Sequence, residues 1–321
     1  MLTLRDETFR LNYGTQWYSS SMLLTNNPQN EASSSGRRRA LCGIRTLVLI
    51  GVLPLLFTSV EAQPKPVKSV RLYVFDCGAI KGLGMNLFNM KESDVKEASV
   101  VVPCYLIVDP KGTLMWDVGV IPDTAFKADG APVKQGVSTV TRPLLPQLAA
   151  VGYTPADIKY VAFSHYHSDH TANANAFAGS TWLVRKEERD AMFAEKPAGI
   201  IQQSFFKDLK DSKTIILDKD EYDVFGDGKV MIKSAPGHTP GHMVLLVKLK
   251  KTGPILVAGD LYHYPEEKTL NRFPTFEFNK EQSAASRKAI DEYLQKNHAK
   301  MWIEHDKATF DSLKKAPDYY E

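Results

Sequence analysis

A histidine-rich stretch, SHYHSDH at residues 164–170, limits the folds open to this chain. It places three of the eight histidines and one aspartate within six positions, directly after the apolar run IKYVAF, which is typical of a buried strand. On an extended turn, His165 and His167 can point toward one cation, and Asp169 and His170 can reach a second cation beside it. The alternative is a polar loop whose histidines only make hydrogen bonds.

Three more candidate ligands occur where apolar, strand-like runs end. His238 follows VMIKSAP, Asp260 follows PILVAG, and His305 follows KMWIE. Loops at strand ends can present such side chains to a common rim, and a buried aspartate is costly without a cation or hydrogen bonds. Taken singly, His238 could cap its Gly/Pro turn and His305 could be a surface residue. Together with the histidine-rich stretch, they predict a metal site.

The first 62 residues are predicted to lie outside the folded domain. Residues 1–36 are rich in Ser, Asn and Thr, and we expect them to be disordered. The stretch GRRRALCGIRT, the apolar run Leu47–Phe57 and the small residues of VEA then follow in the order of a secretory signal peptide. An uncleaved anchor is the alternative, but a spanning helix needs about 20 apolar residues. We expect export to the periplasm or the medium, and no stable membrane insertion after cleavage.

Residues 63–321 contain no Gly/Ser-rich or Pro-rich linker and are predicted to form a single α/β domain. One group of strand-like runs comprises Val70–Phe75, Val101–Val108 and Thr113–Val118, and a helix-like stretch at 142–151 follows it. A second group, VMIKSAP, MVLLVKL and PILVAGD, is followed by the helix-like NKEQSAASRKAIDEYLQKN. This order predicts two packed sheets with helices outside. The net charge of +3 forms no basic stripe, which argues against a nucleic-acid partner.

The cysteine count leaves two pairing states open. Cleavage of the leader would remove Cys42 and leave Cys77 and Cys104, each within an apolar run. A disulfide between them is possible in an oxidising compartment. We favour two buried free thiols, because cysteine readily packs as a small apolar side chain.

The pattern H-x-H-x-D-H, followed by the Gly-His of PGHTPGH, a Gly-Asp and a late His, resembles the metallo-β-lactamase superfamily over essentially all of residues 63–321. The resemblance implies an αβ/βα sandwich of two mixed β-sheets with outer helices and a dinuclear site at one edge between the sheets. It implies two divalent ions, with Zn²⁺ as the default and Mn, Fe or Co as alternatives. The implied ligands are His165, His167 and His238 for one metal, Asp169, His170 and His305 for the other, and Asp260 as the bridge.

Within that superfamily, the blocks RLYVFDCG, VPCYLIVDPKGTLMWDVG and SHYHSDHTANANAF look like those of quorum-quenching N-acyl homoserine lactonases. Asp260 stands where broad-spectrum β-lactamases use Cys, and the few residues after His305 leave no room for the C-terminal helical region of glyoxalase II. The resemblance implies an enzyme that opens the lactone ring of a small-molecule substrate. The alternative is a hydrolase of another ester or an organophosphate, similar to methyl parathion hydrolase, because His263 occupies a place where the lactonases often carry Tyr.

The resemblance also implies the roles of residues around the metals. A hydroxide held between the two ions would attack the lactone carbonyl, whose oxygen Tyr262 or His263 would hydrogen-bond. Asp169 would pass a proton to the leaving alkoxide. Tyr264 is a further candidate for the substrate contact, and packing in the pocket wall is the alternative for all three neighbours. His242 is expected to support the ligands rather than to bind metal.

Two apolar segments complete the expectations. Residues 82–90 and 192–206 carry Met and Phe side chains that either form mobile lids over an acyl chain or pack on the core. The same side chains would also suit the interface of a homodimer.

Overall fold

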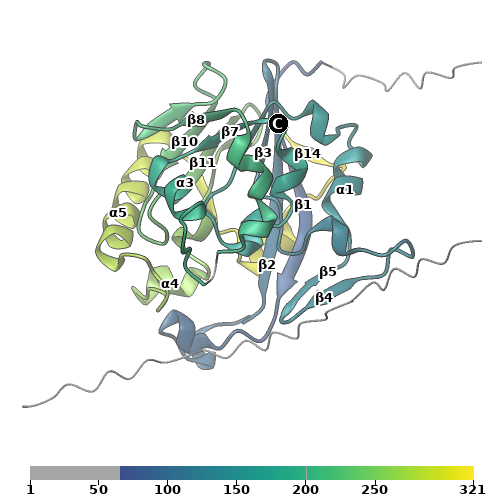
Figure 1. Cartoon of the computed structure of the whole chain (residues 1–321). Helices are drawn as coiled ribbons and strands as arrows, with labels where there is room; N and C mark the ends of the chain where they lie inside the picture. Colours follow the sequence, from purple (N-terminus) through teal and green to yellow (C-terminus); the bar gives the residue numbers. More distant parts are fainter. Residues whose placement is uncertain (1–65, 200) are drawn as a thin grey trace, which may run out of the picture. The chain divides into compact units, whose positions relative to one another are not determined.

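The computed structural model describes residues 66–199 and 201–321 (Figure 1). The leader predicted for residues 1–62 therefore lies outside the described residues. Within the described part, no helix has both the length and the apolar character needed to cross a bilayer.

The described strands form two sheets. The first sheet has nine strands in the order β4-β5-β1-β2-β3-β6-β7-β8, with β14 paired to β1. Its β1, β2 and β3 pair antiparallel, whereas β3, β6, β7 and β8 run parallel, so the sheet is mixed. The bounds are β1 Arg71–Ile80, β2 Val100–Asp109, β3 Gly112–Trp116, β4 Val133–Gln135, β5 Ser138–Val140, β6 Tyr160–Ala162, β7 Thr181–Val184, β8 Thr214–Ile216 and β14 Tyr319–Tyr320.

The second sheet has five strands in the order β13-β12-β11-β10-β9. Only the β12–β13 pair is parallel, so this sheet is mixed too. Its bounds are β9 Glu221–Asp223, β10 Val230–Ser234, β11 Met243–Leu249, β12 Gly253–Val257 and β13 Lys300–Trp302. The helices are α1 Leu144–Ala150, α2 Ser168–Thr171, α3 Lys186–Met192, α4 Pro265–Thr269, α5 Lys280–Asn297 and α6 Lys307–Ser312.

The alternation of side chains along the central strands explains the layers. On β2, Tyr105 and Ile107 pack between the sheets, whereas Cys104 and Leu106 face the outer layer that contains α1. Strand β11 divides its residues in the same way between the inter-sheet core and the side covered by α5. Strands buried on both faces appear in sequence as continuous apolar runs, and each fully buried Leu or Ile contributes about 1.5–3 kcal/mol. Figure 1 shows α1 and α5 on opposite sides of the strands.

The predicted helices are confirmed, and the fold class with them. Helix α1 lies within the predicted 142–151, and α5 begins at the side-chain cap of Asn279, which accepts a hydrogen bond from the Gln282 N–H. The strand predicted over IKYVAF is shorter, Tyr160–Ala162, because the chain already turns at Ser164. Strand β13 likewise stops at Trp302, before the last residues of KMWIE.

The prediction of free thiols was wrong. Cys77 and Cys104 form a disulfide, with Cα atoms 5.9 Å apart. Cys104 pairs with Phe75 in the β1–β2 ladder, and Cys77 lies at the irregularity of β1 between Asp76 and Ala79. That irregularity brings two side chains of neighbouring strands onto the same face within bonding distance, which the sequence pattern did not reveal.

The two predicted lid segments are packed on the core. Met85, Phe88 and Met90 are buried in one small cluster, and Ile201 and Phe206 are buried in the core of the first sheet. These side chains therefore serve packing, which was the second of the two interpretations.

Candidate metal centre

All seven predicted ligands lie together, because each follows the end of a strand at the same edge of the two sheets. The loop after β6 carries four of them, and the ends of β10, β12 and β13 in the other sheet carry the remaining three. Six are at least nine-tenths buried, whereas Asp169 keeps partial exposure. The seven residues are His165, His167, Asp169, His170, His238, Asp260 and His305.

One group of ligand atoms comprises His165, His167, His238 and Asp260, all within 4.8 Å of one another. The Oδ2 atom of Asp260 lies 3.5 Å from His165 Nε2 and 3.3 Å from His238 Nε2. His238 Nε2 lies 3.1 Å from His167 Nδ1. This arrangement of three imidazoles and one carboxylate is typical of a zinc-type site.

A second group lies on the other side of Asp260. Its Oδ1 atom is 3.1 Å from His170 Nε2 and 3.0 Å from His305 Nε2. Asp169 Oδ2 lies 3.6 Å from His305 Nε2, so Asp169, His170 and His305 form a set of their own. The two oxygens of Asp260 thus face two different ligand sets, as a carboxylate bridging two cations requires.

The polar atoms of the cluster are better arranged to bind divalent cations than to form hydrogen bonds with one another. The Nε2 atom of His165 and the Oδ1 atom of Asp260 are buried without a hydrogen-bond partner. His170 Nε2 and His305 Nε2 approach to 3.3 Å, although each imidazole already has a partner at Nδ1. Such unsatisfied buried groups are costly, and a cation at each set would satisfy them.

A second layer of partners fixes the orientation of the imidazoles. Where Nδ1 is hydrogen-bonded, Nε2 is left free to face the cluster, which is the usual arrangement around metal-binding histidines. The Nδ1 partners are Asp117 Oδ2 for His170 at 2.9 Å, Glu277 Oε1 for His238 at 3.1 Å, Val101 O for His305 at 2.7 Å and Ser164 Oγ for His165 at 3.0 Å.

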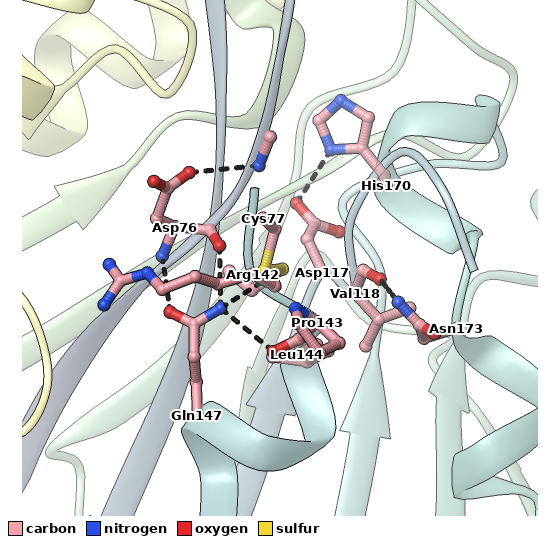
Figure 2. The surroundings of a disulfide bond; sticks show 12 residues. Asp76, Cys77, Asp117, Val118, Arg142, Pro143, Leu144, Gln147, His170 and Asn173 are labelled. Atoms are coloured by element: carbon pink, nitrogen blue, oxygen red, sulfur yellow. Dashed lines mark hydrogen bonds and ion pairs between the residues drawn. A yellow bond between two sulfur atoms is a disulfide. The ribbon is translucent and has the colours of Figure 1, made fainter. Parts of the chain in front are cut away.

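Asp117 was missed by the sequence analysis. Its Oδ1 accepts from the N–H of Ser164 at 2.7 Å. Its Oδ2 contacts His170 Nδ1, as Figure 2 shows. The adjacent Val118 N–H donates to the carbonyl of His170 at 2.8 Å. Asp117 also has a positive φ of 52°, a strained conformation typical of residues with a positional role. The Asp after an apolar strand in MWDVG was the available signal.

Glu304 is a second buried carboxylate that the sequence analysis did not single out. Its Oε1 accepts from Trp116 Nε1 at 3.2 Å and from the N–H of Gly259 at 3.3 Å. Burial and the neighbouring Asp117 raise the pKa of Glu304 well above its usual range, although His170 opposes them. Glu304 therefore joins the loops that carry Asp260 and His305 beneath the metal centre.

The electrostatics keep Asp260 ionised and two of its neighbours neutral. Burial raises the pKa of Asp260, but the surrounding histidines outweigh burial and hold it well below its usual range. Burial lowers the pKa of His165 and His167 well below the ordinary histidine value. Ionised carboxylate and neutral imidazole are the forms that bind metal ions.

His242 supports the cluster, as predicted, without joining it. Its Nδ1 donates to the carbonyl of Ala235 at 3.0 Å, and its Nε2 accepts from the N–H of Asp260 at 3.0 Å. Burial lowers the pKa of His242 to about 3, so its ring stays neutral and able to accept.

The three neighbours Tyr262, His263 and Tyr264 point in different directions. Only His263 reaches the cluster, with Nε2 3.0 Å from Asp260 Oδ2. Tyr262 packs with the side chains of α5, with the Arg287 guanidinium 4.2 Å from its ring centre, and Tyr264 donates to the carbonyl of Ala98 at 3.0 Å. The catalytic role predicted for Tyr262 finds no support in this position, because its ring packs among side chains of α5 rather than at the ligands.

Opposing effects act on the charge of His263. Burial lowers its pKa, but Asp260 and Glu267 more than compensate and raise the pKa to about 10. The ring is held between the two carboxylates, with Nδ1 facing Glu267 Oε1 and Nε2 facing Asp260 Oδ2.

Glu188 on α3 joins two of the ligand-bearing loops. Its buried carboxylate accepts from the Tyr166 N–H at 2.7 Å, from Thr239 Oγ1 at 2.8 Å and from the Gly241 N–H at 2.8 Å. Tyr166 lies between two ligands of the first loop, and Thr239 follows His238. Burial is the largest influence and raises the pKa of Glu188 to about 7 against these hydrogen bonds.

Replacing Glu188 with glutamine is expected to change how stability depends on pH. Because the pKa rises from 4.5 to about 7 on folding, the folded wild type holds this proton more tightly and loses stability as the pH rises through that window. Between pH 4.5 and 8, the free energy of unfolding of Glu188→Gln should rise relative to that of wild type by on the order of 3 kcal/mol. Urea unfolding at several pH values measures this difference. Glu187→Gln, an exposed neighbour on the same helix, should follow wild type, and parallel curves for all three proteins would contradict the expectation.

A pocket of about 170 Å³ opens beside the cluster. It is lined by His167, Ser168, Asp169 and Phe276, so two ligand residues form part of its wall. The Phe276 ring centre lies 5.7 Å from those of His238 and His263. The pocket therefore offers a small organic molecule access to the cluster along an apolar wall.

Known proteins share this combination of fold and site. The sequence profile that describes the metallo-beta-lactamase superfamily matches residues 100–301. The N-acyl homoserine lactonase AttM of Azorhizobium caulinodans is 30% identical over 263 residues, which cover 78% of this chain and 99% of that protein. AttM of Agrobacterium fabrum is 32% identical over 266 residues, covering 78% and 98%. The crystal structure of a Bacillus thuringiensis AiiA variant with N-decanoyl-L-homoserine at its active site has a TM-score of 0.64 at 24% identity, covering 78% and 99%.

The family model spans more than half of the chain, and the relatives align along almost their entire length. The two mixed sheets with outer helices and the ligand cluster at their common edge agree with these alignments, which confirms the resemblance inferred from the histidine pattern. The chain belongs to the metallo-beta-lactamase superfamily.

Proposed function

We propose that this protein is a metal-dependent hydrolase that opens the lactone ring of N-acyl homoserine lactones and thereby quenches quorum signals. The observation that carries the proposal is the position of Asp260, whose two oxygens face two complete ligand sets 3.0–3.5 Å away. The lactonase relatives, aligned over 78% of the chain, support this choice of substrate.

The ligand sets suit two divalent cations. His165, His167 and His238 would hold one ion, Asp169, His170 and His305 the other, and Asp260 would lie between them. Two such cations would supply activation of water at neutral pH and polarisation of the ester carbonyl. Imidazole with carboxylate favours Zn²⁺, and the same donors also bind Mn, Fe or Co.

The chain's own side chains complete the reaction. Of the three neighbours at 262–264, His263 is the one whose ring reaches the cluster, and it would contact the carbonyl oxygen as negative charge develops on that atom. When the ester C–O bond of the ring breaks, the water oxygen stays on the carbonyl carbon. Asp169, which lines the pocket, carries the proton from that water to the departing alkoxide. The products are one carboxylate and one alcohol within the same opened molecule, and the second proton of the water is released to solvent.

Phe276 is expected to limit the length of acyl chain that fits. It walls the 170 Å³ pocket, so Phe276→Ala should raise the ratio of kcat/KM for a C10 lactone to that for a C4 lactone by about tenfold. Steady-state kinetics across chain lengths measures this ratio. Phe278→Ala is the matched control, because Phe278 is 60% exposed and lies outside the pocket lining. An unchanged ratio in Phe276→Ala, or the same shift in both variants, would show that Phe276 is not the wall.

A substrate panel tests the proposal against its alternative. C4 to C12 acyl homoserine lactones, an aryl ester and an aryl phosphotriester would be compared at equal enzyme concentration by kcat/KM. We expect the lactones to exceed the others by at least about a hundredfold, as differential transition-state binding allows. The reverse order would replace the lactonase by an organophosphate or ester hydrolase on the same site.

We also infer that the protein is exported. The Cys77–Cys104 disulfide supports export, because disulfides persist in oxidising compartments. Homodimer formation stays a prediction, and light scattering of the purified protein would test it.

A further inference from the structure

A buried ion pair lies directly behind His263. Glu267 on α4 is fully buried, and Arg287 on α5 is 6% exposed. Glu267 Oε2 accepts from Arg287 Nη2 at 2.7 Å, and Glu267 Oε1 accepts from both the backbone N–H and Nδ1 of His263, at 3.2 and 3.1 Å. Both carboxylate oxygens are thus engaged, one by the guanidinium and one by a single histidine.

Arg287 is held rigidly in turn. Its Nε donates to the carbonyl of Leu261 at 2.9 Å, and its Nη1 donates to the carbonyl of Arg272 at 2.5 Å. The aromatic rings of Tyr262 and Phe273 lie 4.2 and 4.1 Å from the guanidinium carbon. A planar group with three directed hydrogen bonds and two aromatic neighbours is held in a single position. Because Glu267 is bonded to this group, the position of its carboxylate is fixed as well.

The imidazole of His263 is confined on its remaining sides. It stacks on His305 with 5.6 Å between ring centres and a 14° interplanar angle, and the Phe88 ring centre lies 5.0 Å away. With Nδ1 held by Glu267, the ring has one orientation, and Nε2 faces Asp260 Oδ2 at 3.0 Å. Catalytic donors act best when they are fixed before the substrate arrives.

The ion pair is poorly explained by stability alone. Burying a carboxylate and a guanidinium costs more than an apolar pair of the same size would, so a buried pair is weak evidence of a stabilising role. Its geometry, in contrast, matches a positioning role, because Glu267 binds the same histidine at two atoms.

We propose that Glu267 and Arg287 are positioning residues that fix the His263 ring with Nε2 toward Asp260 and the metal centre. This inference rests on the proposed function, in which His263 contacts the ester carbonyl oxygen beside that centre. It assigns a task in the reaction to two residues of α4 and α5 that bind neither metal nor substrate.

A double-mutant cycle tests the proposal in the full-length, metal-loaded protein. Glu267→Gln and Arg287→Met should each lower kcat about 10- to 100-fold with KM changed less than about threefold, since partners of site histidines typically contribute that much. In a His263→Ala background, the same substitutions should change kcat by less than about twofold. Arg287→Lys should restore little, because an ammonium cannot reproduce the three directed hydrogen bonds of the guanidinium.

Lys268→Met is the matched control. Lys268 lies on α4 beside Glu267 and reaches the Tyr262 ring at 5.8 Å, but it is exposed and pairs with Asp291 at the surface. Its substitution should leave kcat within about twofold of wild type. If the fold-losses of kcat from Glu267→Gln and His263→Ala multiply in the double variant, Glu267 acts independently of His263. That result would overturn the proposal.

A spectroscopic measurement separates this inference from the proposed function. In ¹⁵N-histidine-labelled protein, the His263 Nδ1 proton bonded to Glu267 should give a resolved signal that is lost in Glu267→Gln and kept in Lys268→Met. If the protein opens no lactone, the double-mutant cycle is measured with the ester that the substrate panel selects. The proton signal of His263 tests the orientation of the ring without any substrate being hydrolysed. A signal that survives in Glu267→Gln would contradict the positioning role.

Discussion

Asp260→Ala is expected to abolish both metal binding and hydrolysis. The two oxygens of this carboxylate face the two ligand sets, and its removal leaves several histidines facing one another without the charge that draws cations between them. We expect kcat/KM to fall by at least about a thousandfold, because two bound cations would together supply the activation of water and the polarisation of the carbonyl. Elemental analysis of the purified protein should find less than one equivalent of metal per chain.

Asp109→Asn is the control for this substitution. Asp109 is also buried, but it accepts from the N–H of Lys111 in the turn between β2 and β3 and lies outside the ligand groups. Its variant should keep its metal and its activity. If Asp260→Ala kept two equivalents of metal and turned over substrate at the wild-type rate, Asp260 could not bridge the two sites.

Replacing Cys77 and Cys104 with alanine is expected to produce the largest loss of stability. The disulfide closes a loop with a sequence separation of 27 residues, which in the chain-entropy model corresponds to about 3.5 kcal/mol of unfolding free energy at 25 °C. The lost packing of two sulfur atoms in the core of the first sheet adds to this. Denaturant unfolding measures the loss.

Reductant provides the matching control for the cysteine pair. It should lower the unfolding midpoint of wild type toward that of the double variant and leave the double variant unchanged. A wild-type midpoint that is insensitive to reductant would mean that the two cysteines are free thiols, as the sequence alone had favoured.

The metal ligands could be predicted from sequence because each is local to a recognisable strand end. His238 and Asp260 both follow apolar runs that had to be buried strands. Strands β10 and β12 each pair antiparallel with β11, so both end at the same edge of the second sheet. The fold class followed from the same runs, because strands buried on both faces leave continuous apolar stretches. The apolar runs and the polar residues that follow them can be recognised in the sequence, because neither depends on a contact with a distant segment.

The outer partners could not be predicted, because they depend on contacts between distant segments. Asp117 holds His170 across 53 positions, and Glu277 reaches His238 from the segment before α5. The direction of Tyr262 was equally hidden, since it depends on where Arg287 of α5 packs. The state of Cys77 depends on an irregularity within β1 that brings its side chain beside Cys104.

Metal-dependent opening of N-hexanoyl homoserine lactone, followed by proton release, tests the central claim most directly. The account predicts that protein with two equivalents of divalent metal releases one proton per lactone, that chelation stops the reaction, and that added Zn²⁺ restores it. Protein that holds both metal equivalents while the lactone ring stays intact would contradict the proposed activity.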